Sequence, residues 1–151
     1  MNKKTISVFG IILLLASSAH ATLVYPVDPS VVATIKDKNG KKYQFRETYD
    51  IDHGAGSYVY DFGRDGKYKE IYSGDTYSED ETCPPENSDT QFDNAIIEHN
   101  YIKKDVNGDG LNDITLNIVE ENCKTGEKTK FIKQILSTSN GFEIKTSQHK
   151  E

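Results

Sequence analysis

Apolar and polar positions alternate with a period of two along much of the chain after residue 30, which is the pattern of half-buried β-strands. The clearest case is the run Ile114, Leu116 and Ile118, in which Thr115 and Asn117 separate the apolar side chains. Further strand candidates lie at residues 31–35, 42–49, 57–62, 68–72 and 142–146. No amphipathic run with helical spacing extends beyond two turns. The pattern therefore predicts a domain built of short strands.

Turn residues separate these candidates and suggest how they pair. Asn39-Gly40 predicts a hairpin between the first two strands. Residues 74–89 are acidic and contain proline, so we expect a long exposed loop there. The type of residues 95–102 stays open, and residues 130–137 fit either a short helix or a strand paired with residues 113–120. We predict an all-β fold, one antiparallel domain arranged as a sandwich or a small barrel.

The first 21 residues have the composition of a secretory signal peptide. Lys3 and Lys4 precede the apolar residues 6–16, and Ala19-His20-Ala21 fits the small-residue cleavage pattern. The apolar run is shorter than the roughly 20 residues that a membrane span needs. We therefore expect cleavage after Ala21, a single domain over residues 22–151, and a periplasmic or secreted product that is not inserted in a membrane.

Charge and length exclude several classes of protein. The whole chain has 151 residues, with 18 Lys and Arg against 24 Asp and Glu. The first 21 residues hold two Lys and no acid, so the remainder has 16 basic and 24 acidic residues, a net charge of −8. Such a surface repels the phosphates of nucleic acids. The chain is also too short for a large scaffold such as the TIM barrel.

The two cysteines, Cys83 and Cys123, both lie in the expected mature chain. Export to an oxidising compartment favours a disulfide between them, although two free buried thiols remain an alternative. Two cysteines without a neighbouring Cys or His do not match the spacing of a zinc site.

Residues 105–113, with the sequence DVNGDGLND, have the spacing of a calcium-binding loop. Side chains with oxygen atoms occupy positions 1, 3, 5 and 9, and glycine occupies position 6, and Ca²⁺ takes six to eight oxygen ligands. The predicted ligands are the side chains of Asp105, Asn107, Asp109 and Asp113 and the backbone carbonyl of Leu111. An acidic turn without a metal is the alternative, because the same residue types are common in turns. Position 12 is not Glu, which favours a strand-loop-strand arrangement over an EF-hand.

This loop resembles the D-x-[DN]-x-D-G-x-x-D loops of FG-GAP and VCBS-type repeat proteins. In those families the loop joins two β-strands and the calcium is structural. The resemblance covers about ten residues, so it implies the ligand set of the loop and a stabilising role for Ca²⁺ here.

A second resemblance concerns the tyrosine-rich residues 57–81. The segment Ser73-Gly74-Asp75-Thr76-Tyr77 is similar to the S-G-x-x-Y loop of periplasmic lysozyme inhibitors, which are small β-proteins. The resemblance implies a partner contact that includes Tyr72, Ser73 and Tyr77. Ordinary packing within a sheet is the other reading of the tyrosines.

These observations favour a non-catalytic, exported, calcium-stabilised binding module. Its expected partner is a protein with a basic surface, such as a cell-wall hydrolase that it inhibits or to which it confers immunity, or else a glycan. A small calcium-dependent secreted hydrolase and a structural surface or adhesion component are the alternatives. No catalytic residue can be assigned, because His99 lies among apolar residues and no nucleophile motif is present.

Overall fold

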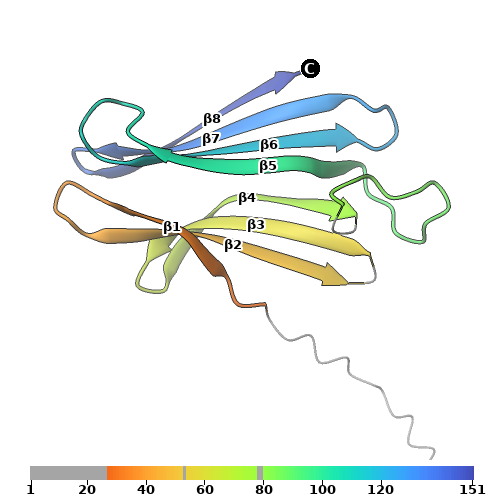
Figure 1. Cartoon of the computed structure of the whole chain (residues 1–151), viewed down its shortest axis with the longest axis horizontal. Helices are drawn as coiled ribbons and strands as arrows, with labels where there is room; N and C mark the ends of the chain where they lie inside the picture. The colour runs from red at the N-terminus through yellow and green to blue at the C-terminus, as the bar shows by residue number, and fades with distance from the viewer. Residues whose placement is uncertain (1–26, 53, 78–79) are drawn as a thin grey trace, which may run out of the picture.

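The computed structural model of the chain describes residues 27–151, except residues 53, 78 and 79. The expected signal peptide, residues 1–21, lies outside the described part. Two four-stranded antiparallel sheets lie face to face, as Figure 1 shows. The described residues contain no helix, and so none that could cross a membrane. The prediction of an all-β fold is confirmed, and the sandwich is the form that it takes.

Each sheet is a meander in which consecutive strands are neighbours, in the orders β1-β2-β3-β4 and β5-β6-β7-β8. The strands are β1 (Ser30–Lys36), β2 (Lys42–Asp52), β3 (Ala55–Arg64), β4 (Lys67–Tyr77), β5 (Asn94–Lys104), β6 (Asp113–Asn122), β7 (Lys128–Thr138) and β8 (Gly141–Lys150). The hairpin loops therefore alternate between two ends of the sandwich. The β1–β2, β3–β4, β5–β6 and β7–β8 loops share one end, on the left of Figure 1, and the other loops lie at the opposite end.

Alternation along the strands produces the core. On β3, every second side chain from Gly56 to Phe62 is buried, as a strand with one covered face requires. Phe45 and Tyr60 are fully buried, with ring centroids 5.6 Å apart, and Leu116 of the opposite sheet belongs to the same core. Burial of one such side chain contributes about 1.5–3 kcal/mol, so a few of them account for much of the stability of a domain of this size.

In three segments the structure corrects the predicted secondary structure or decides between the alternatives that the sequence left open. Residues 74–77 belong to β4 and not to the predicted loop, which is shorter. A Cβ on Gly74 would lie 3.0 Å from the Ile96 side chain, so this glycine allows β4 to pack closely against β5 of the opposite sheet. Residues 95–102 are part of β5. Residues 130–137 are part of β7 and pair with β6, so the helical alternative is wrong there.

The predicted hairpin at Asn39-Gly40 is confirmed. Gly40 has a φ of 76°, in the region that glycine adopts without strain. The buried carboxylate of Asp37 accepts hydrogen bonds from the backbone N–H groups of Asn39 and Lys41, both at 2.9 Å. The side chain of Asp37 thus closes the turn between β1 and β2.

Candidate functional site

The predicted calcium loop connects β5 to β6, and its side chains fold back onto its own backbone. The carboxylate of Asp105 accepts hydrogen bonds from the N–H groups of Gly108 (2.7 Å) and Gly110 (2.9 Å). Asn107 Oδ1 accepts the N–H of Asp109 at 3.1 Å, and Asp109 Oδ1 accepts the N–H of Leu111 at 2.9 Å. Both glycines have positive φ, 77° and 85°, which allows the chain to curl around these oxygen atoms.

Asp113 anchors the loop from the first position of β6. Its side chain is fully buried, which for a carboxylate requires good hydrogen-bond donors. Oδ2 accepts the N–H groups of Val106 (2.8 Å) and Asn107 (3.4 Å), and Oδ1 accepts the N–H of Ser137 at 2.7 Å. Asp113 therefore joins the loop to strand β7.

Ser137 is the residue of this site that the sequence did not reveal. Its hydroxyl donates to Asp109 Oδ2 at 2.6 Å, and its carbonyl accepts a hydrogen bond from Asn107 Nδ2 at 2.8 Å. Together with its N–H bond to Asp113, Ser137 contacts three of the predicted ligands from a strand 24 or more residues away in sequence. Only the pairing of β6 with β7 brings it there, so no local motif could have indicated it.

The hydrogen bonds of the loop favour the ionised form of Asp109. The Ser137 hydroxyl, and then the N–H of Leu111, hold the pKa of Asp109 below its usual range. Among the residues that the structure describes, no three His, Cys, Asp or Glu side chains are arranged as a metal-binding group. The donor set itself, three carboxylates and one amide, is of the hard-oxygen type that Ca²⁺ prefers. A carboxylate oxygen that accepts one N–H retains a further lone pair for a cation.

The first sheet contains a counterpart of this loop. Both sheets begin with a hairpin, and in each the loop starts Asp-x-Asn-Gly, at Asp37 in the β1–β2 loop and at Asp105 in the β5–β6 loop. Position 5 is Lys41 in the first loop and Asp109 in the second. The first loop therefore has a positive charge where the second loop has a carboxylate, and it lacks the donor set of a cation site. Its turn is closed by the side chain of Asp37, at position 1.

A test of the loop geometry concerns the Ser137→Ala variant. We expect the pKa of Asp109 to rise toward its usual value, because the largest cause of its depression is removed. In the unmodified protein the pKa of Asp109 is lower in the folded state than in the unfolded state. The contribution of this carboxylate to the free energy of unfolding is therefore present above its unfolded pKa, and is lost as the pH falls through the folded pKa. Carboxyl NMR titration measures the change, and Ser139→Ala, an exposed serine two residues away, is the matched control. An unchanged Asp109 titration in Ser137→Ala would contradict the assignment.

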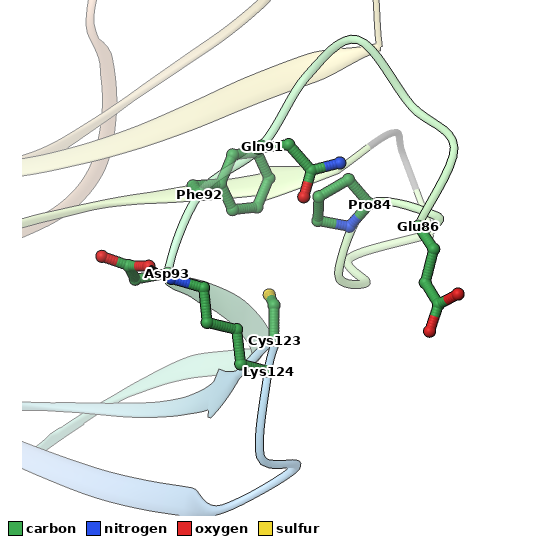
Figure 2. A pocket seen from close by; sticks show the side chains of 7 residues that line it. All are labelled: Pro84, Glu86, Gln91, Phe92, Asp93, Cys123 and Lys124. Atoms are coloured by element: carbon green, nitrogen blue, oxygen red, sulfur yellow. Dashed lines mark hydrogen bonds and ion pairs between the residues drawn. The ribbon is translucent and has the colours of Figure 1, made fainter.

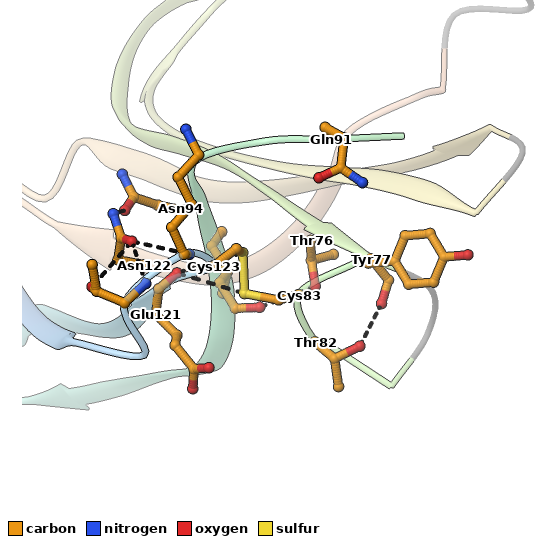
Figure 3. The surroundings of a disulfide bond; sticks show 12 residues. Thr76, Tyr77, Thr82, Cys83, Gln91, Asn94, Glu121, Asn122 and Cys123 are labelled. Atoms are coloured by element: carbon orange, nitrogen blue, oxygen red, sulfur yellow. Dashed lines mark hydrogen bonds between the residues drawn. A yellow bond between two sulfur atoms is a disulfide. The ribbon is translucent and has the colours of Figure 1, made fainter. Parts of the chain in front are cut away.

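At the opposite end of the sandwich, the predicted disulfide is confirmed. Cys83 and Cys123 are bonded, with Cα atoms 5.4 Å apart. Figure 3 shows that Cys83 closely follows the Tyr77–Thr82 backbone pair and that Cys123 immediately follows β6. A hydrogen bond from the N–H of Cys123 to the carbonyl of Asp93, at 2.8 Å, reinforces the same junction. The disulfide thus attaches the acidic β4–β5 loop to the second sheet.

Glu81 attaches the same loop to the inside of the sandwich. Its Oε1 accepts hydrogen bonds from Tyr58 Oη at 3.0 Å and lies 2.8 Å from His99 Nε2. The other ring nitrogen of His99 lies 2.5 Å from Tyr60 Oη, which donates its own proton to Glu47 at 2.8 Å. Glu81 has a φ of 52°, which is uncommon for a residue other than glycine, so this anchoring contact holds the backbone in an unfavourable conformation.

Carboxylates hold the tyrosine hydroxyls of this cluster. Burial raises the pKa of Tyr58 and Tyr60, and their bonds to Glu81 and Glu47 raise it further, so both hydroxyls keep their protons. His99 of β5 lies between Tyr60 and Glu81, with one ring nitrogen toward each. The cluster thus connects β3 and β5 to the β4–β5 loop.

A cavity of about 470 Å³ lies beside the disulfide. Figure 2 shows Pro84, Gln91 and Phe92 of the loop on one side, and Asp93, Cys123 and Lys124 on the other. Asp93 and Lys124 form an exposed ion pair at 2.6 Å, and Glu86 also lines the cavity. Lys124 holds the pKa of Asp93 below its usual range. The cavity thus has an apolar wall of Pro84 and Phe92 and charged side chains of both signs.

The three predicted partner-contact residues are placed differently. Tyr72 is buried and its hydroxyl donates to Glu120 of the opposite sheet, so its ring is not available at the surface. Ser73 is exposed and donates to Glu70 at 2.9 Å, and Tyr77 is half-buried beside Thr82. Tyr58 and Tyr60 are buried too, so these tyrosines serve sheet packing, as the second reading of the sequence held.

Comparison of the chain with protein-family models, with curated proteins and with solved structures gave no match.

Proposed function

We propose that the protein is an exported, non-catalytic binding module that presents the acidic end of its sandwich to a basic protein, with a cell-wall hydrolase such as lysozyme as the leading partner. The observation that carries this proposal is the position of exposed carboxylates at the end that holds the disulfide. Asp50, at the end of β2, and Asp75, at the end of β4, are exposed beside the long β4–β5 loop. That loop adds exposed Asp80, Glu86 and Asp89.

The attachment of this loop at two points supports a binding role. A long loop that is ordered only on binding reduces affinity by the entropy of that ordering, and preorganisation avoids the loss. Here the Cys83–Cys123 bond and the contact of Glu81 with Tyr58 and His99 hold the loop at two separate points. The cavity beside the disulfide gives the surface a concave feature in addition to its charge.

The charge of the module suits association with a basic partner. Complementary charge raises the association rate and selects against partners of like charge. Many cell-wall hydrolases are basic, because their substrate is anionic. An acidic module in the same compartment is therefore suited to bind them without any chemistry of its own.

Calcium has a stabilising role in this proposal. The loop at residues 105–113 lies at the end of the sandwich opposite the acidic loop, as Figure 1 shows. Asp105, Asn107, Asp109 and Asp113 with the carbonyl of Leu111 would hold the ion, which would add a fixed positive charge between carboxylates. A site there would reinforce the β5–β6–β7 junction rather than contact the partner.

The experiment is a titration of the oxidised protein against a basic lysozyme, followed by both calorimetry and inhibition of cell-wall hydrolysis. We expect saturable one-to-one binding with inhibition. The double variant Glu86→Lys/Asp89→Lys should weaken binding by about tenfold or more. Charges exposed at an interface act mainly on the association rate, and the substitutions reverse the charge that attracts a basic partner.

The control variant is Glu70→Lys/Glu143→Lys, which changes net charge equally but lies outside the β4–β5 loop. It should change affinity by about twofold at most at physiological ionic strength, where distant surface charges are screened. Equal weakening by both double variants would reduce the effect to net charge, and no binding at all would refute the proposed partner.

A further inference from the structure

A groove of about 420 Å³ opens between the two sheets at the end opposite the acidic loop. It is lined by the beginning of β4 and the beginning of β8, together with residues of β2 and β3. Figure 1 places the β3–β4 and β7–β8 turns at this same end. The groove is thus separate from the disulfide, the acidic loop and the surface that the proposed function uses.

Aromatic rings form one wall of the groove. Tyr43 and Phe62 are stacked, with centroids 5.6 Å apart, and Phe142 meets both edge-on at 4.8 Å and 5.1 Å. Phe62 is buried, but Tyr43, Phe142 and the neighbouring Ile144 are only half-buried. An aromatic cluster with an open side offers ring faces and edges to a further flat ring.

Two lysines of β4 line the same groove. Lys67 and Lys69 are exposed, and within the described part of the chain neither forms an ion pair. The nearby carboxylates have other partners, because Asp65 pairs with Arg64 at 2.6 Å and Glu143 pairs with Lys145 at 3.6 Å. The groove therefore combines an apolar aromatic wall with two cations that no carboxylate of the described chain neutralises.

We propose that this groove binds a small amphipathic anion, specifically an aromatic carboxylate whose ring packs against Tyr43 and Phe142 while its carboxylate faces Lys67 and Lys69. Its volume lies within the usual range for small-molecule sites, which are mostly apolar with a few placed polar groups. The protein is acidic overall, so a local pair of lysines favours a ligand with a negatively charged group at this position. The aromatic wall favours a ligand with an aromatic ring. The proposal is independent of the partner at the acidic end.

The test uses 2-naphthoate, followed by its fluorescence and by calorimetry. The unmodified protein should bind it saturably with one-to-one stoichiometry. The variant Lys67→Glu/Lys69→Glu should weaken binding by about tenfold, which corresponds to about 1.4 kcal/mol. Lys103→Glu/Lys104→Glu, with the same charge change on exposed residues at the end of β5, should change affinity by about twofold at most.

The uncharged analogue 2-naphthalenemethanol distinguishes the contribution of the aromatic wall to affinity from that of the two lysines. It should bind more weakly than 2-naphthoate to the unmodified protein and equally to the Lys67→Glu/Lys69→Glu variant. Absence of saturable naphthoate binding, or equal affinities in the two double variants, would overturn the proposal. Circular dichroism of each variant verifies that the sandwich is intact.

Discussion

Removal of the disulfide by Cys83→Ser/Cys123→Ser is expected to lower the free energy of unfolding by about 4 kcal/mol. The bond closes a segment of 40 residues, and restriction of the unfolded chain by a loop of this length accounts for about that amount. At this size, about 3 °C of melting temperature corresponds to each kcal/mol, so the transition should fall by roughly 12 °C. Chemical denaturation with linear extrapolation gives the free energy directly.

Reduction provides the control for this prediction. A thiol reductant should lower the melting temperature of the unmodified protein toward that of the double serine variant, and should leave the variant unchanged. If the proposed function holds, the reduced protein should also bind lysozyme more weakly, because the loop loses one of its two anchors. A double serine variant as stable as the parent would show that hydrogen bonds such as Cys123 N–H to Asp93 suffice at this junction.

Much of the fold follows from local sequence. The alternation at Ile114, Leu116 and Ile118 predicts β6, and Asn39-Gly40 predicts the first hairpin, because both signals act over a few residues. The acidic, proline-containing composition of residues 74–89 predicts a loop that includes residues 74–77. In the structure Thr76 is fully buried and its hydroxyl donates to the carbonyl of Ile96 at 3.0 Å. That contact lies between sheets, and no pattern along β4 encodes it.

In the candidate sites too, features that depend on neighbouring residues could be predicted, and features that depend on strand register or sheet stacking could not. Disulfide pairing could be predicted because only two cysteines are present. The oxygen-bearing side chains of residues 105–113 were recognisable because their spacing is local, and their role as calcium ligands stays a prediction. Ser137 could not be recognised, since the register of β7 against β6 determines its position. Tyr72 also depends on long-range information: the resemblance of residues 73–77 implies a partner contact there, whereas the stacking of the second sheet buries the Tyr72 ring.

The predicted calcium loop yields the second large effect, through Asp113. In EDTA, Asp113→Ala is expected to lower the free energy of unfolding by about 3 kcal/mol or more. The substitution leaves the buried N–H of Ser137 and the part-buried N–H of Val106 without their acceptor, and a buried group left in this way costs about 1–3 kcal/mol. Asp109→Ala, in an exposed position, should cost less than about 1 kcal/mol under the same conditions.

Addition of Ca²⁺ then separates metal binding from hydrogen bonding. At about 100 times its dissociation constant, Ca²⁺ should stabilise the unmodified protein by about 2.7 kcal/mol, a rise of roughly 8 °C, and thermal unfolding measures it. Asp109→Ala should lose this rise while it retains most of its stability in EDTA, because Asp109 would contribute to the ion more than to the apo loop. Asp37→Ala, in the counterpart loop of the first sheet, should retain the full calcium response. If the unmodified protein does not respond at millimolar Ca²⁺, the range of extracellular calcium modules, the loop is a turn closed by its side-chain hydrogen bonds without a metal.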